Sequence, residues 1–366
     1  MRTREKKRGR GYWIFLLVWS VLLTVVLAVS LIWFYGFLKE YQRVFEETRP
    51  LLYQNEVMQV FTSGDAERIL EQAEPVELGP FEGRKELADF INDYLSGKNL
   101  DFGTKAGEHI EERPVYVVTA DEVPFAVVRL KKKAQTAAYG LPLWETDRIE
   151  LLPLPRKEYS LLAPSTVTVT VNGIPVTEDA MEESGLRGTA EEYLEAYTQI
   201  PSYNRYDLGQ FYGEPELSGV NAAGERVDIG YNETEHCYKA AFGGDKLFQD
   251  TVEDYVIKVV TDYAMYVSND AAYNSLDKYF PKKSPLLEGI KKNQREWFDY
   301  HLKPEVKNQE IKDFIVYSED AFSAQVYLEQ YMYVPYSKKT EMLVTDLHVY
   351  FVKIDGAWKV SGIAFQ

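Results

Sequence analysis

Residues 347–365, LHVYFVKIDGAWKVSGIAF, decide how the C-terminal part of the chain folds. Leu347, Val349 and Phe351 alternate with more polar residues, which is the period of a β-strand with one buried face. Asp355-Gly356 then offers the residue types that a tight hairpin turn requires. The stretch after this turn predicts a second strand that pairs back on the first.

A long amphipathic helix is predicted ahead of these strands, starting near Gln249. Its apolar residues recur every three or four positions: Val252, Tyr255, Val256, Val259, Tyr263, Tyr266 and Val267. Shorter helices are expected at residues 274–280 and 289–302, and period-two strands at 308–319 and 321–334. Helices followed by strands indicate an α+β segment over residues 246–366.

This segment resembles the nuclear transport factor 2-like superfamily, in which a curved antiparallel sheet wraps around a long first helix as a cone. The resemblance is carried by VSNDAAYNSLDKYF at residues 267–280 and by the closing stretch. Five closing residues match the family's D-G turn and Trp-Lys-aliphatic triplet: Asp355, Gly356, Trp358, Lys359 and Val360. The resemblance implies the cone fold, and it says little about activity because this fold hosts enzymes, binding modules and assembly subunits alike.

Residues 39–155 look like a weaker copy of the same plan, with helices first and strands afterwards. TSGDAERIL at residues 62–70 stands where 267–280 stands in the second copy, and the D-G-x-W-K ending is missing. The segment between the copies, residues 156–245, predicts a small, mostly β module with a hairpin turn at Asn172-Gly173. The expected α+β architecture is therefore two cone-shaped domains separated by this module.

Residues 12–38 form an apolar run without a charged side chain. Twenty-seven helical residues reach about 40 Å, enough to cross a hydrocarbon core of about 30 Å. The tail, residues 1–11, holds six basic residues and one acidic residue. The positive-inside rule therefore predicts a single-pass cell-membrane protein with a cytoplasmic N-terminus and extracytoplasmic domains after Leu38. A cleaved signal peptide is the alternative, although its apolar region ordinarily spans only about 7 to 15 residues.

Charge and composition exclude several classes of protein. The chain has 366 residues with Lys+Arg 41 and Asp+Glu 57, a net charge of −16, which argues against a nucleic-acid partner. Without the tail, 35 basic and 56 acidic residues remain, a net charge of −21. Cys237 is the single cysteine, and the four histidines show no metal-ligand spacing. We find no catalytic, Walker or dinucleotide motif, and therefore expect no enzyme, no cofactor and no metal.

One candidate pocket follows from the resemblance. Enzymes of this superfamily enclose an apolar pocket in the cone, where a carboxylate and a tyrosine or histidine handle protons. The matching residue types here are Tyr263 and Tyr266 on the helix, with Asp346, His348 and Tyr350 on one strand face. The alternative is that the tyrosines are core packing and that Asp346 and His348 face water.

A second candidate site follows from the 27 tyrosines of the chain. Tyr327, Tyr331 and Tyr333 share one strand face and alternate with apolar residues. Tyrosine is enriched at protein interfaces and also stacks on sugars, so this face predicts an interaction surface. The alternative is a sheet that uses aromatic residues because they suit strands.

Together these observations favour a non-catalytic, membrane-anchored interaction or assembly protein of a bacterial cell envelope. Single-pass proteins with one or two such cones resemble components of conjugative or secretion machines, and similar cones precede the catalytic domain of some wall-synthesis enzymes. The expected partners are the lipid bilayer through residues 12–38 and an envelope or membrane protein, with cell-wall glycan as a further candidate. The alternatives are a small-molecule-binding, glycan-binding or enzymatic protein that uses the C-terminal cone pocket, and a sensor of an envelope ligand.

Overall fold

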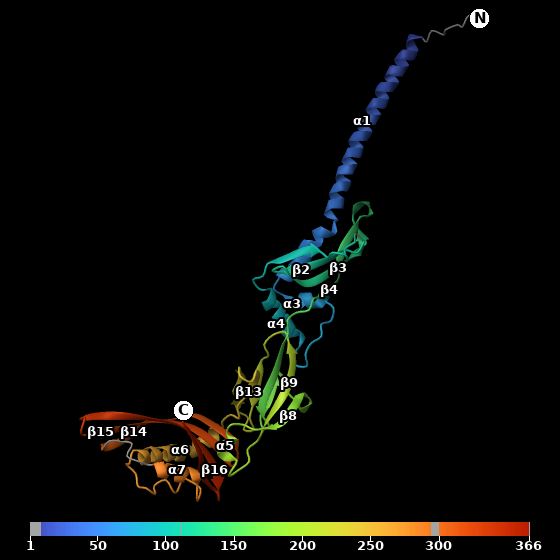
Figure 1. The fold of residues 1–366 in the computed structure, drawn as a ribbon. Helices are drawn as coiled ribbons and strands as arrows, with labels where there is room; N and C mark the ends of the chain where they lie inside the picture. Colours follow the sequence, from blue (N-terminus) through green and yellow to red (C-terminus); the bar gives the residue numbers. More distant parts are fainter. Residues whose placement is uncertain (1–8, 111, 294–299, 366) are drawn as a thin grey trace. The chain divides into compact units, whose positions relative to one another are not determined.

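The computed structural model describes residues 9–110, 112–293 and 300–365. It confirms an α+β protein with several antiparallel sheets and a long apolar helix at the N-terminus (Figure 1). The chain divides into two compact units. Unit 1 is Met1–Glu77 with Gly83–Pro155, and unit 2 is Leu78–Glu82 with Arg156–Gln366. The segments predicted at 156–245 and 246–366 both fall in unit 2, and the boundary between them stays a prediction.

Helix α1 (Arg10–Glu47) contains the whole apolar run. Its large apolar side chains are exposed, and its most apolar window has a mean hydropathy of 2.8. The helix is long and apolar enough to cross a membrane, a description that a signal sequence also meets. It ends at Glu47 with Thr48 as its C-cap, and Pro50 then begins a 3₁₀ turn (η1, Pro50–Tyr53).

Beyond α1, unit 1 places short helices before a four-stranded sheet, the order that the sequence predicts. The helices are α2 (Gln54–Thr62), α3 (Ala66–Gln72) and α4 (Arg84–Leu95). The strands are β1 (Leu100–Thr104), β2 (Val115–Ala120), β3 (Val123–Thr136) and β4 (Pro142–Leu151), with a 3₁₀ turn (η2, Ala138–Gly140) before β4. They pair in chain order, all antiparallel. Phe125 of β3 packs against Phe61 and Tyr94, which joins the sheet to α2 and α4.

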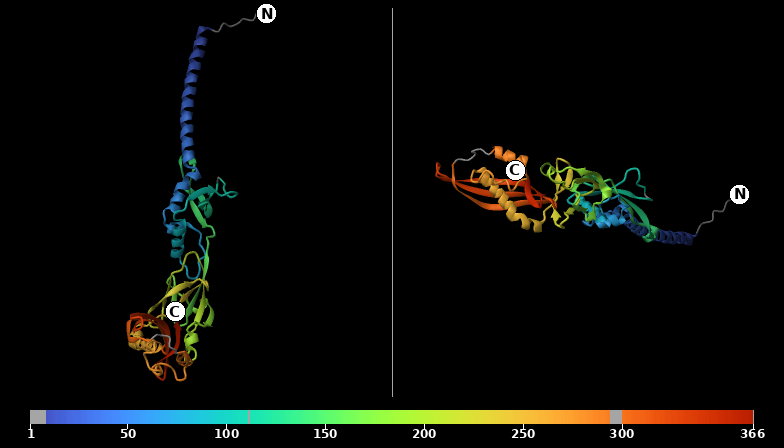
Figure 2. Two further views of the ribbon diagram at one scale, coloured as in Figure 1. Left: turned by 60° about the vertical axis from the view of Figure 1, so that its left-hand side comes forward. Right: turned by 90° about the horizontal axis from the view of Figure 1, so that it is seen from below.

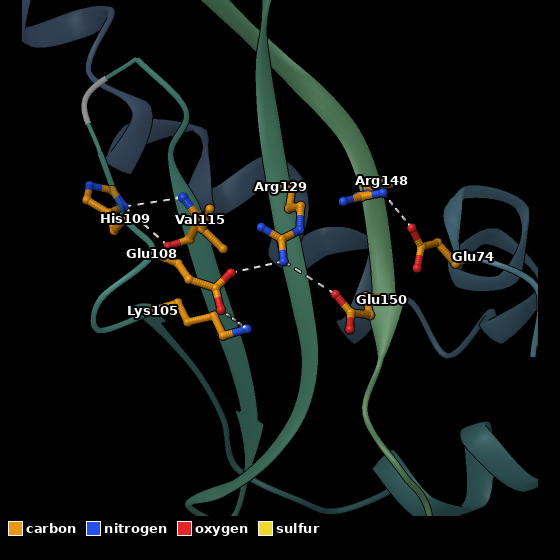
Figure 3. A network of polar contacts seen from close by, with 8 residues as sticks. All are labelled: Glu74, Lys105, Glu108, His109, Val115, Arg129, Arg148 and Glu150. Atoms are coloured by element: carbon orange, nitrogen blue, oxygen red, sulfur yellow. Dashed lines mark hydrogen bonds and ion pairs between the residues drawn. The ribbon is translucent and has the colours of Figure 1, made fainter.

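A network of charges lies over this sheet (Figure 3). Arg129 of β3 reaches Glu108 at 3.0 Å and Glu150 of β4 at 3.5 Å, and Lys105 reaches Glu108 at 2.7 Å. Hydrogen bonds from Lys105 and then Arg129 hold the pKa of the Glu108 carboxyl below its usual value. We call these four residues the charged face, because each carboxylate has a cation beside it.

The first part of unit 2 is built from short strands in two sheets. The strands are β5 (Lys157–Pro164), β6 (Thr168–Val171), β7 (Ile174–Pro175), β8 (Met181–Leu186), β9 (Tyr203–Phe211), β10 (Leu217–Val220), β11 (Arg226–Val227), β12 (Ile229–Asn232) and β13 (Cys237–Ala240). The sheet orders are β12-β13-β5-β9-β8 and β11-β10-β6-β7, and only the β13–β5 pair of these is parallel. Asn172 and Gly173 have φ of 50° and 78° between β6 and β7, which confirms the predicted hairpin turn.

The second part of unit 2 places a long helix against one sheet (Figure 2). Its elements are α6 (Lys246–Val267), α7 (Pro285–Asn293), β14 (Leu302–Ser318), β15 (Ala321–Val334), β16 (Lys339–Ile354) and β17 (Ala357–Phe365). The strands pair antiparallel in chain order, and Asp355 and Gly356 have φ of 50° and 77° in the last turn, as predicted. The inner sheet face packs on α6 around Phe322 and Phe351, whose rings stack at 4.6 Å.

Two shorter elements differ from the sequence prediction. Residues 274–280 form hydrogen-bonded turns, not a helix. Asn, Ser and Asp in this stretch offer the backbone side-chain hydrogen-bond partners that compete with helix formation. The helix expected at 289–302 corresponds in part to α7, and residues 294–299 of that prediction lie outside the described residues.

The two parts of unit 2 share an apolar cluster on the outer side of the β14–β17 sheet. Tyr193, in the short helix α5 (Glu191–Leu194), stacks on Tyr350 of β16 at 4.3 Å. Phe242, just after β13, packs edge-on against Tyr317 of β14 at 5.0 Å. Gly362 of β17 allows Tyr193 to pack closely against the sheet, because a Cβ at position 362 would lie 2.5 Å from Tyr193 Cδ1.

Candidate interaction surface

Strand β15 points alternate side chains to its two sides. Val326 and Leu328 are fully buried in the cluster around α6, and Met332 is also buried. Tyr327, Tyr331 and Tyr333 therefore lie together on the outer side, as the alternation predicts.

Glu329 organises these tyrosines, since it lies between Tyr327 and Tyr331 on the same side of the strand. The Tyr327 hydroxyl donates to Glu329 Oε1 at 2.9 Å, and the Tyr331 hydroxyl donates to Oε2 at 2.6 Å. Asn308 of β14 adds a third donor at 2.7 Å. These bonds, with that from Tyr331 first, lower the pKa of Glu329, and they raise the pKa of both tyrosines. The hydroxyls are thereby held and the rings present a fixed orientation.

Asp346 of β16 lies directly opposite Tyr327 and is held by two donors. Lys312 Nζ lies 2.6 Å from Asp346 Oδ2, and Gln325 donates to Oδ1 at 2.9 Å. The Lys312 ammonium, followed by Gln325, lowers the pKa of Asp346. The same ammonium lies 4.3 Å from the centre of the Tyr327 ring, so the cation links the carboxylate to the aromatic row.

Apolar side chains are exposed at the free end of this sheet. Leu302 is 41% exposed, Tyr333 37%, Met342 54% and Val344 44%. Strand register pairs Leu302 with Tyr333, and Tyr331 with Met342, so these residues share the outer side. We call this set the tyrosine face: Leu302, Tyr327, Tyr331, Tyr333, Met342 and Val344. Exposed apolar groups gathered around hydrogen-bonded polar ones are typical of a contact surface.

His348 and Tyr350 continue the outer side of β16 toward the covered end of the sheet. His348 Nε2 lies 2.8 Å from Ser323 Oγ, which lies 3.0 Å from the Tyr317 hydroxyl. Burial lowers the pKa of His348 below its ordinary 6.5, and burial raises the pKa of Tyr350. Both side chains take part in contacts within unit 2.

Tyr263 and Tyr266 lie on the inner side, with α6. Tyr266 is fully buried, and burial raises the pKa of Tyr263. The cavity beside Tyr263 has a volume of about 10 Å³, which is room for about one water molecule. The sheet thus separates these tyrosines from Asp346, His348 and Tyr350, and the structure does not bring the five candidates into one pocket.

A larger depression, of about 770 Å³, lies between the two parts of unit 2. Four aromatic residues line it, Phe242, Phe248, Tyr317 and Trp358, together with small and polar residues that include Asp245 and Lys353. No local sequence signal marks this cleft, because residues from both parts of unit 2 meet only in the fold. Glu329 was not among the predicted site residues, although its position between two tyrosines on the same strand face is a signal that could have identified it.

No metal site is found in the part of the chain that the structure describes: no three His, Cys, Asp or Glu side chains lie close enough together. Cys237 is fully buried, and burial, followed by the charge of Glu235, raises the pKa of its thiol. A raised thiol pKa and burial both oppose reaction as a nucleophile.

No protein-family model and no curated protein matches the chain. Three chains of solved structures match it. One is described as "Ntf2 like protein involved in plasmid conjugation", with 11% sequence identity and a TM-score of 0.25 over 82% of this chain and 86% of that chain. That description names the superfamily that the closing stretch resembles. A match at this identity and score says nothing about the function of this chain.

Proposed function

We propose that the protein is a non-catalytic, membrane-anchored interaction protein of a bacterial cell envelope, within a transfer, secretion or wall-related complex. Helix α1 crosses the cell membrane once, the basic tail stays in the cytoplasm, and the folded units lie outside. The tyrosine face is the surface that binds an envelope or membrane protein. The observation that carries this proposal is the row of hydrogen-bonded tyrosines beside exposed Leu302, Met342 and Val344.

The anchor is supported by the apolar surface of α1. A folded domain rarely leaves so many large apolar side chains in water, and a lipid phase is the environment that satisfies them. Tyr12, Trp13, Trp33 and Tyr35 near the ends of the run are exposed residues of the kinds that prefer the membrane interface.

The docking role is supported by the polar groups of the tyrosine face. Glu329 and Asp346 are both held by donors from the protein itself, so a partner that covers them leaves these carboxylates paired. Removing apolar surface from water then adds about 25 cal/mol for each Å² buried.

Site-specific photocrosslinking in native membranes tests the docking role. The full-length chain carries a photoreactive phenylalanine in place of Tyr333, and the matched control carries it at Tyr231, which is 43% exposed on β12. We expect Tyr333 to give a discrete cross-linked protein that disappears when Met342→Glu is added. Equal products from both positions, or none from Tyr333, contradict the proposal.

Topology is tested separately with protease added to intact cells. We expect residues after Leu38 to be digested, while alkaline carbonate leaves the fragment that contains α1 in the membrane. Protection of the folded units or release by carbonate contradicts the anchor.

A second candidate function is binding of a small apolar molecule or a wall glycan, and the cleft of about 770 Å³ favours it. Clefts of this volume with aromatic walls accommodate ligands, whereas the interior cavity beside α6 does not. We expect a glycan-binding protein to sediment with purified peptidoglycan and to lose this with Trp358→Ala. Sedimentation that is unchanged by Trp358→Ala, or absent, removes this candidate.

A further inference from the structure

The β3–β4 hairpin extends beyond the sheet of unit 1. Strand β2 pairs with β3 only as far as Arg129, and the rest of β3 pairs with β4 alone. Residues 131–136 are all exposed. This extension is not needed to complete the sheet, so its contacts elsewhere in unit 1 are informative.

The hairpin lies along the last turns of α1 (Figure 1). At its base, the Trp144 indole N–H donates to the Thr48 carbonyl at 3.0 Å. At its tip, the Tyr139 ring lies 5.4 Å from the ring of Phe37 and 5.6 Å from that of Tyr41. Along α1, the eleven steps from Phe37 to Thr48 correspond to about 16 Å, so the hairpin runs beside the helix over about this distance. The tip therefore points back along α1 toward the apolar run.

The position of this contact on α1 is significant because the apolar run ends at Leu38. A ring packed on Phe37 and Tyr41 lies at the depth where the apolar run gives way to charged residues. In a membrane-crossing helix, that depth corresponds to the headgroup layer, which tyrosine side chains favour.

The composition of the tip suits this layer, because residues 137–142 (AAYGLP) hold no charged side chain around Tyr139. Lys131, Lys132 and Lys133 lie at the base of the extension, where Lys132 pairs with Trp144. Lys132 lies 6.0 Å from the Trp144 ring, and Lys131 has Glu145 and Asp147 within 3.7 Å. Tyr139 is 47% exposed despite its contacts with α1, and it has a φ of 63°, a left-handed conformation uncommon for tyrosine.

We propose that the tip of the hairpin, residues 137–142, forms a second membrane contact, which lies in the lipid headgroup layer on the side where α1 emerges. Tyr139 enters the layer beside α1, and Lys131, Lys132 and Lys133 at the base of the extension lie outside it. Unit 1 is thereby held against the bilayer at two points. The inference rests on the proposed anchor and is independent of the proposed partner of the tyrosine face.

The test uses the full-length chain in vesicles of equal parts phosphatidylcholine and phosphatidylglycerol. A polarity-sensitive fluorophore is attached at Ala138→Cys, and in a matched control at Glu122→Cys, which lies in the turn at the opposite end of β3. Cys237 is fully buried, so the unsubstituted chain treated with the same reagent measures background labelling. Flotation with the vesicles is measured for every sample.

We expect the label at 138 to shift its emission to the blue, to resist iodide and to be quenched by nitroxide-labelled lipid headgroups. The label at 122 should show none of these changes. Tyr139→Asn keeps a residue that tolerates the left-handed turn and removes the ring, so it should reverse the blue shift at 138 while flotation persists.

Two outcomes overturn the proposal, and they are distinguishable. If the protein floats but the label at 138 behaves like the label at 122, the hairpin only packs against α1, and the proposed anchor is unaffected. Failure to float removes the anchor and the hairpin contact together.

Discussion

The sheet of unit 1 and the β14–β17 sheet of unit 2 have the same strand order and follow helices in the same way, yet their exposed sides differ. The charged face of unit 1 pairs each carboxylate with a cation, an arrangement that keeps water around it and adds little to stability. The tyrosine face leaves Met342 and Val344 uncovered. The comparison indicates that the helix-covered sides maintain the fold, while the opposite side carries paired charges in one sheet and tyrosines with exposed apolar residues in the other.

The largest effect on stability should come from substitutions on the helix-covered side of each sheet, because both units have such a side. Phe125→Ala in unit 1 and Phe351→Ala in unit 2 each remove a fully buried ring, and each should lower the unfolding free energy by about 3 to 5 kcal/mol. Hydrogen exchange measures the two units separately. Each variant should increase exchange in its own unit alone, and a loss of protection in both units contradicts the division of the chain.

Trp358 should have the next largest effect, because unit 1 has no counterpart to it. Its ring packs on Phe322 and Phe248 and is partly exposed at the cleft. We expect Trp358→Ala to lower the unfolding free energy by about 2 to 3 kcal/mol, somewhat less than truncation of a fully buried ring. Urea denaturation measures the change. A neutral Trp358→Ala contradicts its packing role.

A smaller effect on stability should come from the titration of His348 in unit 2. Burial lowers the pKa of His348 below 6.5, so the unfolded chain takes up this proton at a higher pH than the folded chain. The contribution to stability is therefore complete above pH 6.5 and falls as the pH drops from 6.5 toward the folded pKa. Denaturation of wild type and His348→Gln at several pH values should show this slope in the wild type alone. An equal slope in both means that His348 does not cause it.

The smallest effect on stability should come from removing one hydrogen-bond donor to a carboxylate on the exposed side of each sheet. Tyr331→Phe leaves Glu329 with two donors, and Arg129→Gln leaves Glu108 with Lys105. Each change should move the carboxyl pKa back toward its ordinary value, which NMR titration measures, with little change in stability. A carboxylate with a lowered pKa stabilises the fold above its ordinary pKa, and this is lost as the pH falls through the lowered value. Of the two variants, only Tyr331→Phe should weaken cross-linking from Tyr333, and equal weakening by both contradicts the assignment of the contact to one side.

Local rules predicted local structure in this chain. Asn172-Gly173 and Asp355-Gly356 need positive φ in tight turns, and the structure has both. The positions of Tyr327, Tyr331 and Tyr333 predicted that they share one side, because residues an even number of positions apart in a regular strand point the same way. Such signals depend only on neighbours in the sequence.

The element that covers each side of a sheet could not be predicted from such local signals. Tyr193 lies more than 150 residues before its stacking partner Tyr350, and alternation cannot tell which side a distant element covers. The sequence therefore left open whether Asp346 and His348 line a pocket with the helix tyrosines or face water, and the fold places them on the other side of the sheet from these tyrosines. The pairing of β5 with β9, residues 157–164 with 203–211, is non-local in the same sense.

The chain passes between its two units three times, since residues 78–82 belong to unit 2 although unit 1 continues after them. Phe81 is part of the apolar core of unit 2, and the Glu82 carboxylate accepts a hydrogen bond from the Tyr212 amide at 2.7 Å. A fragment that begins at Arg156 therefore lacks a piece of its own interior. Supplying a peptide that spans residues 78–82 in trans should rescue such a truncated fragment, as in a split protein.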